Sequence, residues 1–152
     1  MRTGATYTVA SKYVCYTQGV REKEFINKVH KHLPTAIYRW KINDAYHGGV
    51  PDAFYAGKKN HCFIEYKYQD TLPKKSTSQI KINLTSQQRL WLNNAKENNI
   101  ICYAVLASGD AVLMSNKFNQ ISISKEDFDN ESITFKKYID RLINICLEVT
   151  ND

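Results

Sequence analysis

Two neighbouring segments decide the fold of this chain: GVPDAFYA at residues 49–56 and HCFIEYKY at residues 61–68. The four residues between them, GKKN, are typical of a hairpin turn, so we expect the two segments to pair as antiparallel strands. Side chains two residues apart in a strand point to the same side, and Glu65 and Lys67 therefore project together. Two opposite charges inside an apolar run indicate either the solvated face of a strand or a functional site.

Asp52, at the start of the first strand, adds a second carboxylate to this pair. Its side chain comes near Glu65 if the hairpin register places the two residues opposite each other. Converging carboxylates repel each other unless a cation lies between them, and oxygen ligands favour Mg²⁺ or Mn²⁺ over zinc. Asp52, Glu65 and the backbone carbonyl of Tyr66 are thus candidate metal ligands. Lys67 is placed to orient or deprotonate an attacking water, or to balance charge on a phosphate.

A helix before the hairpin supplies a further carboxylate. Apolar residues recur at helical spacing from Phe25 to Leu33 and make one stripe. Glu22 lies on that stripe one turn before Phe25, whereas Glu24 faces away from it. We expect Glu22 to reach the metal directly or through a water. The alternative is a surface glutamate that is favoured by the helix dipole.

Periodicity and turn residues divide the chain into alternating helices and strands. The order favours an α/β fold with a mixed sheet flanked by helices, in a single domain spanning residues 1–152 with its core at about 21–115. The expected elements are an N-terminal arm (1–20), a helix (21–33), strands (36–40, 52–56 and 61–68), a polar basic loop (71–83), a helix with Thr85 as its N-cap (84–98), strands (100–107 and 111–114) and a C-terminal helix (about 132–148).

The charge balance indicates an anionic partner. Lys and Arg number 21 against 15 Asp and Glu, a net charge of +6, which favours nucleic acid. Basic residues gather in and after the hairpin, and for two of them, Lys74 and Lys75, plain solvent-exposed charge is the alternative. The expected contacts to a nucleic-acid backbone are Lys58, Lys59, Lys74, Lys75, Lys81 and Arg89.

Membrane and zinc-binding classes are disfavoured. The sequence has no apolar run of about eighteen residues, so no membrane span is expected, and residues 1–20 lack the apolar region of a secretory signal. The four cysteines stand at widely spaced positions without a CxxC motif. That spacing indicates structural free thiols at Cys15, Cys62, Cys102 and Cys146, with Cys62 and Cys102 buried in apolar runs.

Together these motifs resemble the PD-(D/E)xK nuclease superfamily. Pro51-Asp52 followed by Glu65-Tyr66-Lys67 matches its signature. The helix glutamate, the GVPD stretch, the strand IEYK and the segment LTSQQRLWL (84–92) look like the VRR-NUC and phage Holliday-junction-resolvase branch. In that branch a glutamine stands in a Leu-Thr-x-x-Gln-x-x-Trp-Leu pattern, which Gln88 fits. The Val-Arg-Arg element that names the VRR branch is not present in this sequence.

The resemblance implies a restriction-endonuclease-like core and metal-dependent hydrolysis of phosphodiester bonds in DNA. By that resemblance Glu22, Asp52 and Glu65 are the acidic and metal-binding residues, Lys67 is the catalytic lysine and Gln88 is a helper, with Mg²⁺ as cofactor and Mn²⁺ as its substitute. Family members often act as dimers on branched or duplex DNA, which implies a structure-selective endonuclease and leaves a homodimer open. A cytoplasmic location is expected, in the host if a phage encodes the protein.

Other interpretations stay open. A non-catalytic nucleic-acid-binding module on the same fold would bind DNA without cutting it, and a restriction-type enzyme would cut at a defined sequence. For Gln88 the alternative role is helix packing beside Trp91. His47, beside two glycines, is either an ordinary loop histidine or a residue that contacts phosphate or acts as an auxiliary base.

Overall fold

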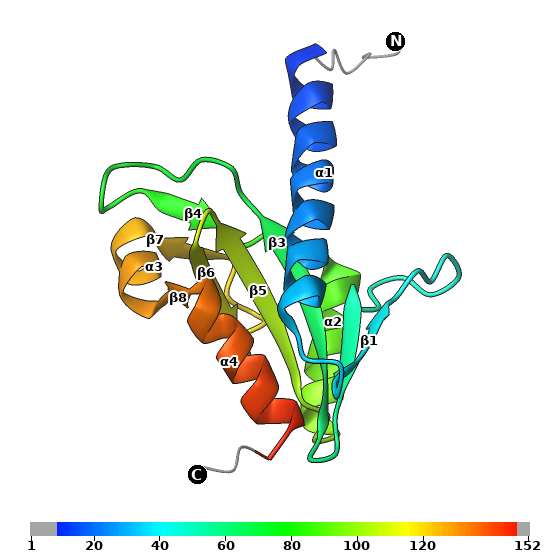
Figure 1. Ribbon diagram of the computed structural model, residues 1–152. Coiled ribbons are helices and arrows are strands. Elements are labelled where there is room, and N and C mark those ends of the chain that lie inside the picture. Colours follow the sequence, from blue (N-terminus) through cyan, green and yellow to red (C-terminus); the bar gives the residue numbers. More distant parts are fainter. Residues whose placement is uncertain (1–8, 149–152) are drawn as a thin grey trace.

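A six-stranded mixed sheet forms the centre of the molecule (Figure 1). The structure is a computed structural model that describes the backbone of residues 9–148 and the side chains from residue 21 to residue 148. Neighbouring strands are antiparallel except β3 and β5, which run parallel. In spatial order the strands are β1 (Tyr38–Lys41), β2 (Ala53–Ala56), β3 (His61–Tyr68), β5 (Cys102–Ser108), β6 (Ala111–Ser115) and β8 (Ile133–Thr134).

Helices cover both faces of this sheet, which confirms the expected α/β class with a mixed sheet and flanking helices. α1 (Val9–His32) and α4 (Phe135–Cys146) pack on one face, and α2 (Ser86–Glu97) packs on the other. The second face is completed by a two-stranded sheet of β4 (Gln79–Lys81) and β7 (Ser122–Ser124) together with α3 (Lys125–Glu131).

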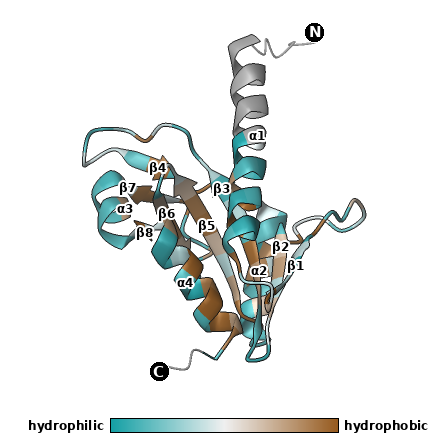
Figure 2. Cartoon of the chain, viewed as in Figure 1, coloured by the Kyte–Doolittle hydropathy of each residue, from teal (hydrophilic) through white to brown (hydrophobic). Residues whose placement is uncertain are grey.

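The largest part of the core lies between the sheet and the pair α1 and α4. The apolar residues of α4 recur three and four positions apart, and Figure 2 shows them as brown bands along the helix. Phe25 of α1 packs edge to face on Tyr66, with ring centroids 5.8 Å apart. The Tyr66 hydroxyl is hydrogen-bonded to those of Tyr55 (2.9 Å) and Tyr138 (2.6 Å). Burying each large side chain of this kind stabilises the fold by roughly 1.5–3 kcal/mol.

β3 contributes side chains to both layers of the core. Cys62, Ile64 and Tyr66 face α1 and α4, whereas Phe63 belongs to the cluster under α2. Because side chains alternate along a strand, Glu65 is directed to the same face as Phe63. The alternation therefore places a carboxylate on the α2 face of the sheet.

Arg39 of β1 fixes the end of α1. Its guanidinium donates hydrogen bonds to the backbone carbonyls of His30, Leu33, Pro34 and Ile37, the last of these at 3.2 Å. These carbonyls lie at the C-terminus of the helix and in the turn after it, where intrahelical donors are lacking. The contacts hold α1 against the sheet edge and so set the position of every residue on it.

The expected N-terminal arm is wrong for the residues that the structure describes. Backbone from Val9 onward is helical and continues into the helix that was expected from Arg21. Extending an existing helix costs much less than starting one, which is consistent with a helix that begins before Arg21. Residues 1–8 of the expected arm lie outside the described part of the chain.

The polar loop expected at 71–83 also needs correction, because it contains β4, which pairs with β7. β7, α3 and β8 had no counterpart among the expected elements. A strand of three residues with a single buried side chain, such as Ile80, shows no recognisable period. β4 is a strand because it pairs with β7, a distant segment of the chain, and the sequence gives no local signal for that pairing.

Two expectations from composition can be compared with the structure. Cys62, Cys102 and Cys146 are free thiols, as expected, and are buried, and the side chain of Cys15 lies outside the described part. Among the described residues, no helix combines the length and the apolar character needed to cross a membrane.

Candidate active site

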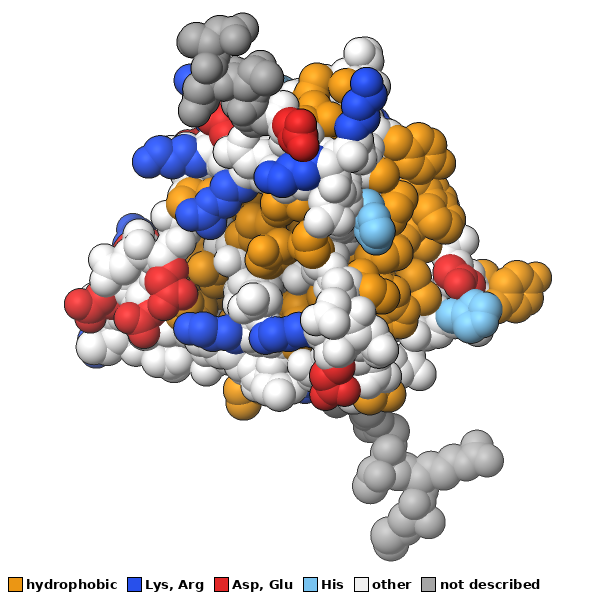
Figure 3. Space-filling model, turned by 90° about the horizontal axis from the view of Figure 1, so that it is seen from below, with side chains coloured by type: hydrophobic (Ala, Val, Ile, Leu, Met, Phe, Trp, Pro, Cys, Tyr) orange, Lys and Arg blue, Asp and Glu red, His pale blue; other side chains and the backbone are white. Residues whose placement is uncertain are grey.

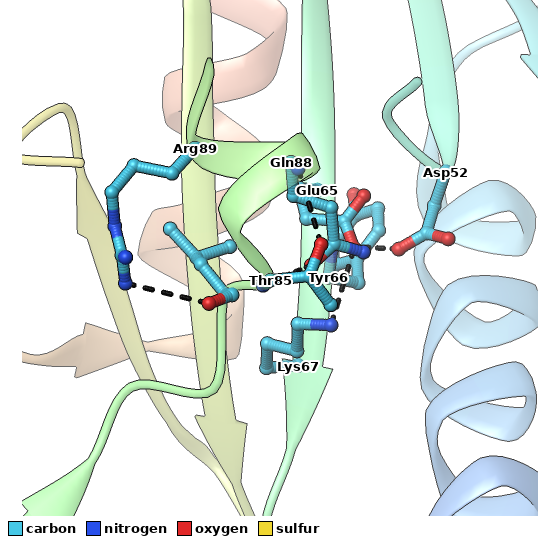
Figure 4. A network of polar contacts seen from close by, with 8 residues as sticks. Asp52, Glu65, Tyr66, Lys67, Thr85, Gln88 and Arg89 are labelled. Carbon is cyan, nitrogen blue, oxygen red and sulfur yellow. Dashed lines mark hydrogen bonds and ion pairs between the residues drawn. The ribbon is translucent and has the colours of Figure 1, made fainter. Parts of the chain in front are cut away.

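The register of the hairpin brings Asp52 next to Glu65. Ala53 pairs with Ile64 at the end of the β2–β3 ladder, so the next residue along each chain direction, Asp52 and Glu65, face each other. Asp52 directly precedes β2, and its side chain accepts a hydrogen bond from β3 of the kind that a backbone carbonyl would accept within a strand pair. Its Oδ2 accepts a 2.8 Å hydrogen bond from the backbone N–H of Tyr66 (Figure 4). The carboxylate is thus held against β3.

Glu65 is buried, with 1% of its surface exposed. Its Oε1 accepts a 2.6 Å hydrogen bond from Nε2 of Gln88 and lies 3.3 Å from Nζ of Lys67. Its Oε2 is the one fully buried side-chain oxygen or nitrogen without a hydrogen-bond partner in the described part of the chain. Burying an unpaired polar group costs about 1–3 kcal/mol, and more when it is charged. Glu65 is therefore a poor choice for stability alone and indicates a functional group.

Gln88 is oriented by the first turn of α2. Oγ1 of Thr85, the expected N-cap, accepts from the Gln88 backbone N–H at 3.1 Å, and Oε1 of Gln88 accepts from the Thr85 backbone N–H at 3.0 Å. This capping box fixes which end of the Gln88 amide faces the helix start. The remaining end, Nε2, donates to Glu65. The structure thus places Gln88 in contact with the carboxylate pair.

Burial raises the pKa values of three carboxyl groups, and the charge of Asp52 adds to the rise for two of them. Burial, and then the charge of Asp52, raise the pKa of Glu65 to about 8 against the opposing charge of Lys67. Burial also raises the pKa of Asp52, opposed by the Tyr66 N–H and by Lys67. The pKa of Glu22 rises to about 7, through burial first and Asp52 second. Such crowding of negative charge would be relieved by a cation.

Glu22 reaches the site from α1 and is half-buried, whereas Glu24 is exposed and pairs with Arg21. Glu22 and Lys67 line the same cavity, which has a volume of about 280 Å³. A phosphate in this cavity would meet the ammonium groups of Lys67 and Lys81. The other lining residues are Gly19, Tyr68, Gln69, Asn83 and Leu106.

The donor set fits a hard divalent cation. Asp52 and Glu65 offer carboxylate oxygens, and Oε2 of Glu65 has no other partner. The N–H and C=O of one strand residue point to the same edge, so the Tyr66 carbonyl lies on the edge where Asp52 accepts the Tyr66 N–H. Among the described residues, no three Asp, Glu, His or Cys side chains gather closely enough to enclose an ion. The ligands would therefore be two carboxylates, one carbonyl and waters, a set that suits Mg²⁺.

Lys58 and Lys59, expected to contact nucleic acid near the site, lie in the hairpin turn at the opposite end of β3 from Lys67. A strand rises about 3.3 Å per residue, which puts the turn roughly 20 Å from Lys67. Nζ of Lys59 donates a 3.0 Å hydrogen bond to the backbone carbonyl of Asn144. Closeness in sequence was a poor guide here, because the whole strand separates the turn from the carboxylates.

Arg89, also expected on the nucleic-acid interface, is engaged with the protein backbone. Its Nε donates to the carbonyl of Phe118 at 2.8 Å, and a terminal nitrogen donates to that of Leu84 at 3.4 Å (Figure 4). These bonds hold the segment that leads into α2. Of the remaining basic positions, Lys74 and Lys75 are exposed in the loop before β4.

The loop between β1 and β2 supports the site in a way that the sequence did not reveal. Gly49 has φ +85°, and a Cβ there would lie 2.3 Å from the backbone oxygen of Gln87. The glycine thus lets the loop dock on the first turn of α2, next to Gln88. His47 on this loop is exposed, and its Nδ1 is hydrogen-bonded to Oδ2 of Asp44 at 2.8 Å, as befits a loop residue.

Lys41 and Asn83 are further members of the site that sequence reasoning missed. Lys41, at the end of β1, opposes the rise in the pKa values of Glu22 and Asp52 through its charge. Asn83 lines the cavity beside Lys67. Neither residue belongs to a motif, so the only signal for Lys41 was its place directly after an expected strand.

No protein-family model and no curated protein matches the sequence. Among solved structures, the fold is similar to that of Hjc, a Holliday junction resolvase from the archaeal hyperthermophile Archaeoglobus fulgidus. The match has a TM-score of 0.49 and 8% sequence identity, and it covers 80% of this chain and 97% of that one.

Proposed function

We propose that this protein is a divalent-metal-dependent endonuclease that hydrolyses phosphodiester bonds in DNA. One observation supports this above the others: the buried Glu65, with one carboxylate oxygen unpartnered, stands beside Asp52, Lys67 and Gln88. A protein that only binds phosphate gains nothing from converging carboxylates, which repel phosphate and cost stability. An enzyme that needs a cation at a scissile phosphate requires them.

Asp52, Glu65 and the Tyr66 carbonyl would hold the ion. When bound, Mg²⁺ would lower the pKa of water and offset charge on the phosphate oxygens. Lys67 has an ammonium group 3.3 Å from Glu65 and a side chain that is 20% exposed. It can therefore touch both the carboxylate and a phosphate in the cavity, where it would orient the attacking water and balance the charge of the transition state. Gln88 would keep Glu65 in place, and Glu22 would support the ion through a water.

The proposed substrate is branched or duplex DNA that is chosen by structure more than by sequence. The net charge of +6 suits a phosphate backbone, and the motifs resemble the Holliday-junction-resolvase branch. Lys81 would contact the backbone beside the cavity, with Lys74 and Lys75 on the neighbouring loop. Lys58 and Lys59 lie at the other end of β3 from Lys67, and Arg89 is bonded to backbone carbonyls, so we assign these three residues no contact at the cleavage site.

Cleavage assays test the proposal. A supercoiled plasmid, a linear duplex and a four-way junction would be incubated with the protein and Mg²⁺ or Mn²⁺. We expect cutting that EDTA abolishes and that Lys67→Ala slows by about 10²–10⁴-fold, the range for a residue that handles a reacting proton. Lys136→Ala, which removes the same charge from an exposed position on α4, is the matched control and should cut like the wild type.

Two results would reject the proposal: no cutting of any substrate with either ion, or undiminished cutting by Lys67→Ala. Salt-dependent DNA binding without cleavage, unchanged or tighter in Asp52→Ala, would instead identify a non-catalytic binding module. Discrete fragments from a long duplex would identify a restriction-type enzyme.

A further inference from the structure

A row of aromatic rings crosses the outer strands of the sheet beside the proposed site. Phe54 of β2 is its centre, with its ring centroid 4.9 Å from that of Phe63 and 6.4 Å from that of Trp40. The row continues from Phe63 to Trp91 on α2, at 5.0 Å. Two more rings contact Phe54, at 6.5 and 5.6 Å. We call the six residues the aromatic ladder: Tyr38, Trp40, Phe54, His61, Phe63 and Trp91.

Much of this ladder is open to solvent. Tyr38 is 62% exposed and Trp40 is 50% exposed, His61 is exposed, and the other three rings are half-buried. Figure 3, which views the molecule from its hairpin end, shows hydrophobic side chains gathered along one flank. A contiguous apolar surface of this kind usually marks a place where something binds.

The ladder is continuous with the carboxylate pair. Phe54 follows Asp52 by two residues, and Phe63 precedes Glu65 by two residues on the paired strand. Residues two apart share a face of the sheet. The pair of rings therefore lies directly beside the pair of carboxylates, and a strand of DNA with its phosphate at Glu65 would have its next nucleotides over the ladder.

The charges around the ladder suit a polyanion. The strand sequences YRWK and AFYA contain no acid, and the first acid of β3 is Glu65 itself. Two copies of this chain, each with a net charge of +6, would repel each other if they met face to face here. Nucleobases combine apolar faces with an anionic backbone and stack on exposed rings in a sequence-tolerant way. In an intact duplex those faces are already stacked, so only unpaired bases are free to bind.

We propose that the aromatic ladder is a stacking platform for unpaired nucleotides next to the phosphate that is held at the carboxylate site. The inference rests on the proposed function in taking DNA as the polymer, and it sharpens that function. The preferred substrate is DNA in which single-stranded nucleotides adjoin the cut, such as a branch point, a flap or a gap.

Binding in EDTA tests the platform without any cleavage. The probes are a fluorescent 20-nucleotide oligothymidylate and a blunt duplex of similar length. Base stacking contributes about 1–3 kcal/mol per base, so Trp40→Ala should weaken oligothymidylate binding by roughly 5- to 150-fold and duplex binding by less than about 2-fold. Ile121→Ala, which also truncates an exposed hydrophobic residue but outside the ladder, should change neither affinity.

Tryptophan fluorescence adds a direct readout. The chain has two tryptophans, so Trp91→Phe leaves Trp40 as the only reporter. Oligothymidylate should quench this Trp40 signal, and the duplex should not. The result that overturns the platform is equal oligothymidylate affinity in Trp40→Ala and Ile121→Ala, with no quenching.

Sedimentation tests the remaining alternative, in which a second copy of the chain covers the ladder. A wild-type dimer that Trp40→Ala converts to a monomer would show that the ladder is an interface between copies, and would also overturn the proposal. These outcomes can be told apart from a failure of the proposed nuclease function. Cleavage that Lys67→Ala does not slow would reject the nuclease, but it would not alter the oligothymidylate binding that is measured in EDTA.

Discussion

At the scale of single residues, Glu65 concentrates the chemistry of this protein. One of its carboxylate oxygens is shared between Gln88 and Lys67, and the other has no partner although it is buried. A buried carboxylate in that state destabilises the fold, and a bound cation would offset this cost. Two consequences at this scale can be measured, one in kinetics and one in stability.

Gln88 should affect catalysis beyond its role in the helix cap. Gln88→Met removes both the capping bond to Thr85 and the hydrogen bond to Glu65. We expect a loss of about 10–100-fold in cleavage rate or metal affinity, as for residues that orient metal ligands. Thr85→Ala is the control, because it breaks the cap and leaves the donor to Glu65. Each variant should lose about 1 kcal/mol of stability, so equal cleavage by both would disprove the positioning role.

Glu65 should make stability fall with increasing pH when no divalent ion is present. Its pKa is about 8 in the folded protein against 4.5 for the free side chain. Between these values the folded state holds a proton that the unfolded state has released, so the free energy of unfolding decreases as pH rises. Melting curves in EDTA from pH 5 to pH 9 should show this slope. Glu65→Gln should reduce the slope to the part that Glu22 contributes through its own raised pKa, and should stabilise the protein at pH 9 by roughly 1–3 kcal/mol. An unchanged slope would contradict the assignment.

At the scale of elements, the site depends on how a helix start and a loop meet. Gln88 is in position because α2 begins at the Thr85 cap, and the β1–β2 loop docks on that first turn through its glycines. Asp52 is in position because β2 begins one residue later, which frees its side chain to accept the Tyr66 N–H. The site is therefore a junction of three element ends.

Gly49→Ala tests this docking. Gly49 has positive φ, and an added Cβ would lie 2.3 Å from the backbone of Gln87, whereas Gly109 has φ +57° with open space around it. Gly109→Ala should cost only the conformational strain, about 1–2 kcal/mol. Gly49→Ala should cost more and should also reduce cleavage, because the first turn of α2 must shift. Equal melting temperatures and equal activities in the two variants would refute the docking.

The same junction shows what the sequence could predict. β3 and α4 have strong apolar periodicity and were found with nearly the observed bounds, and Thr85 was found as a cap. β4, β7 and β8 are two or three residues long and exist through pairing with distant segments, which no local pattern encodes. Asp52 and Glu65 could be brought together by reasoning on the hairpin, since turn and register are local. Lys41 and Asn83 join the site through tertiary contacts, and the GVPD stretch did not indicate that Gly49 docks on α2.

At the scale of the whole molecule, only some of the basic residues lie near the proposed active site. Lys81 lies in the wall of the cavity with Lys67, whereas Lys58 and Lys59 lie at the far end of β3. The aromatic ladder covers the flank between these two ends and carries no acid on β1 or β2. The proposed path of DNA therefore runs from the cavity across the carboxylates to the ladder.

Salt titrations test which lysines lie on that path. Each phosphate contact adds about 0.9 to the slope of log affinity against log salt concentration for duplex DNA. Lys81→Ala should reduce the slope by about that amount, and Lys136→Ala should leave it unchanged. A reduced slope in Lys136→Ala, or an unchanged slope in Lys81→Ala, would indicate that the DNA binds another surface.

The most direct measurement of the central claim is an anomalous diffraction map of crystals that contain Mn²⁺. A metal-dependent nuclease centre predicts a peak within coordination distance of Asp52, Glu65 and the Tyr66 carbonyl, and the loss of that peak in Glu65→Gln. A map at saturating Mn²⁺ with no peak there, or with a peak that persists in Glu65→Gln, would contradict it.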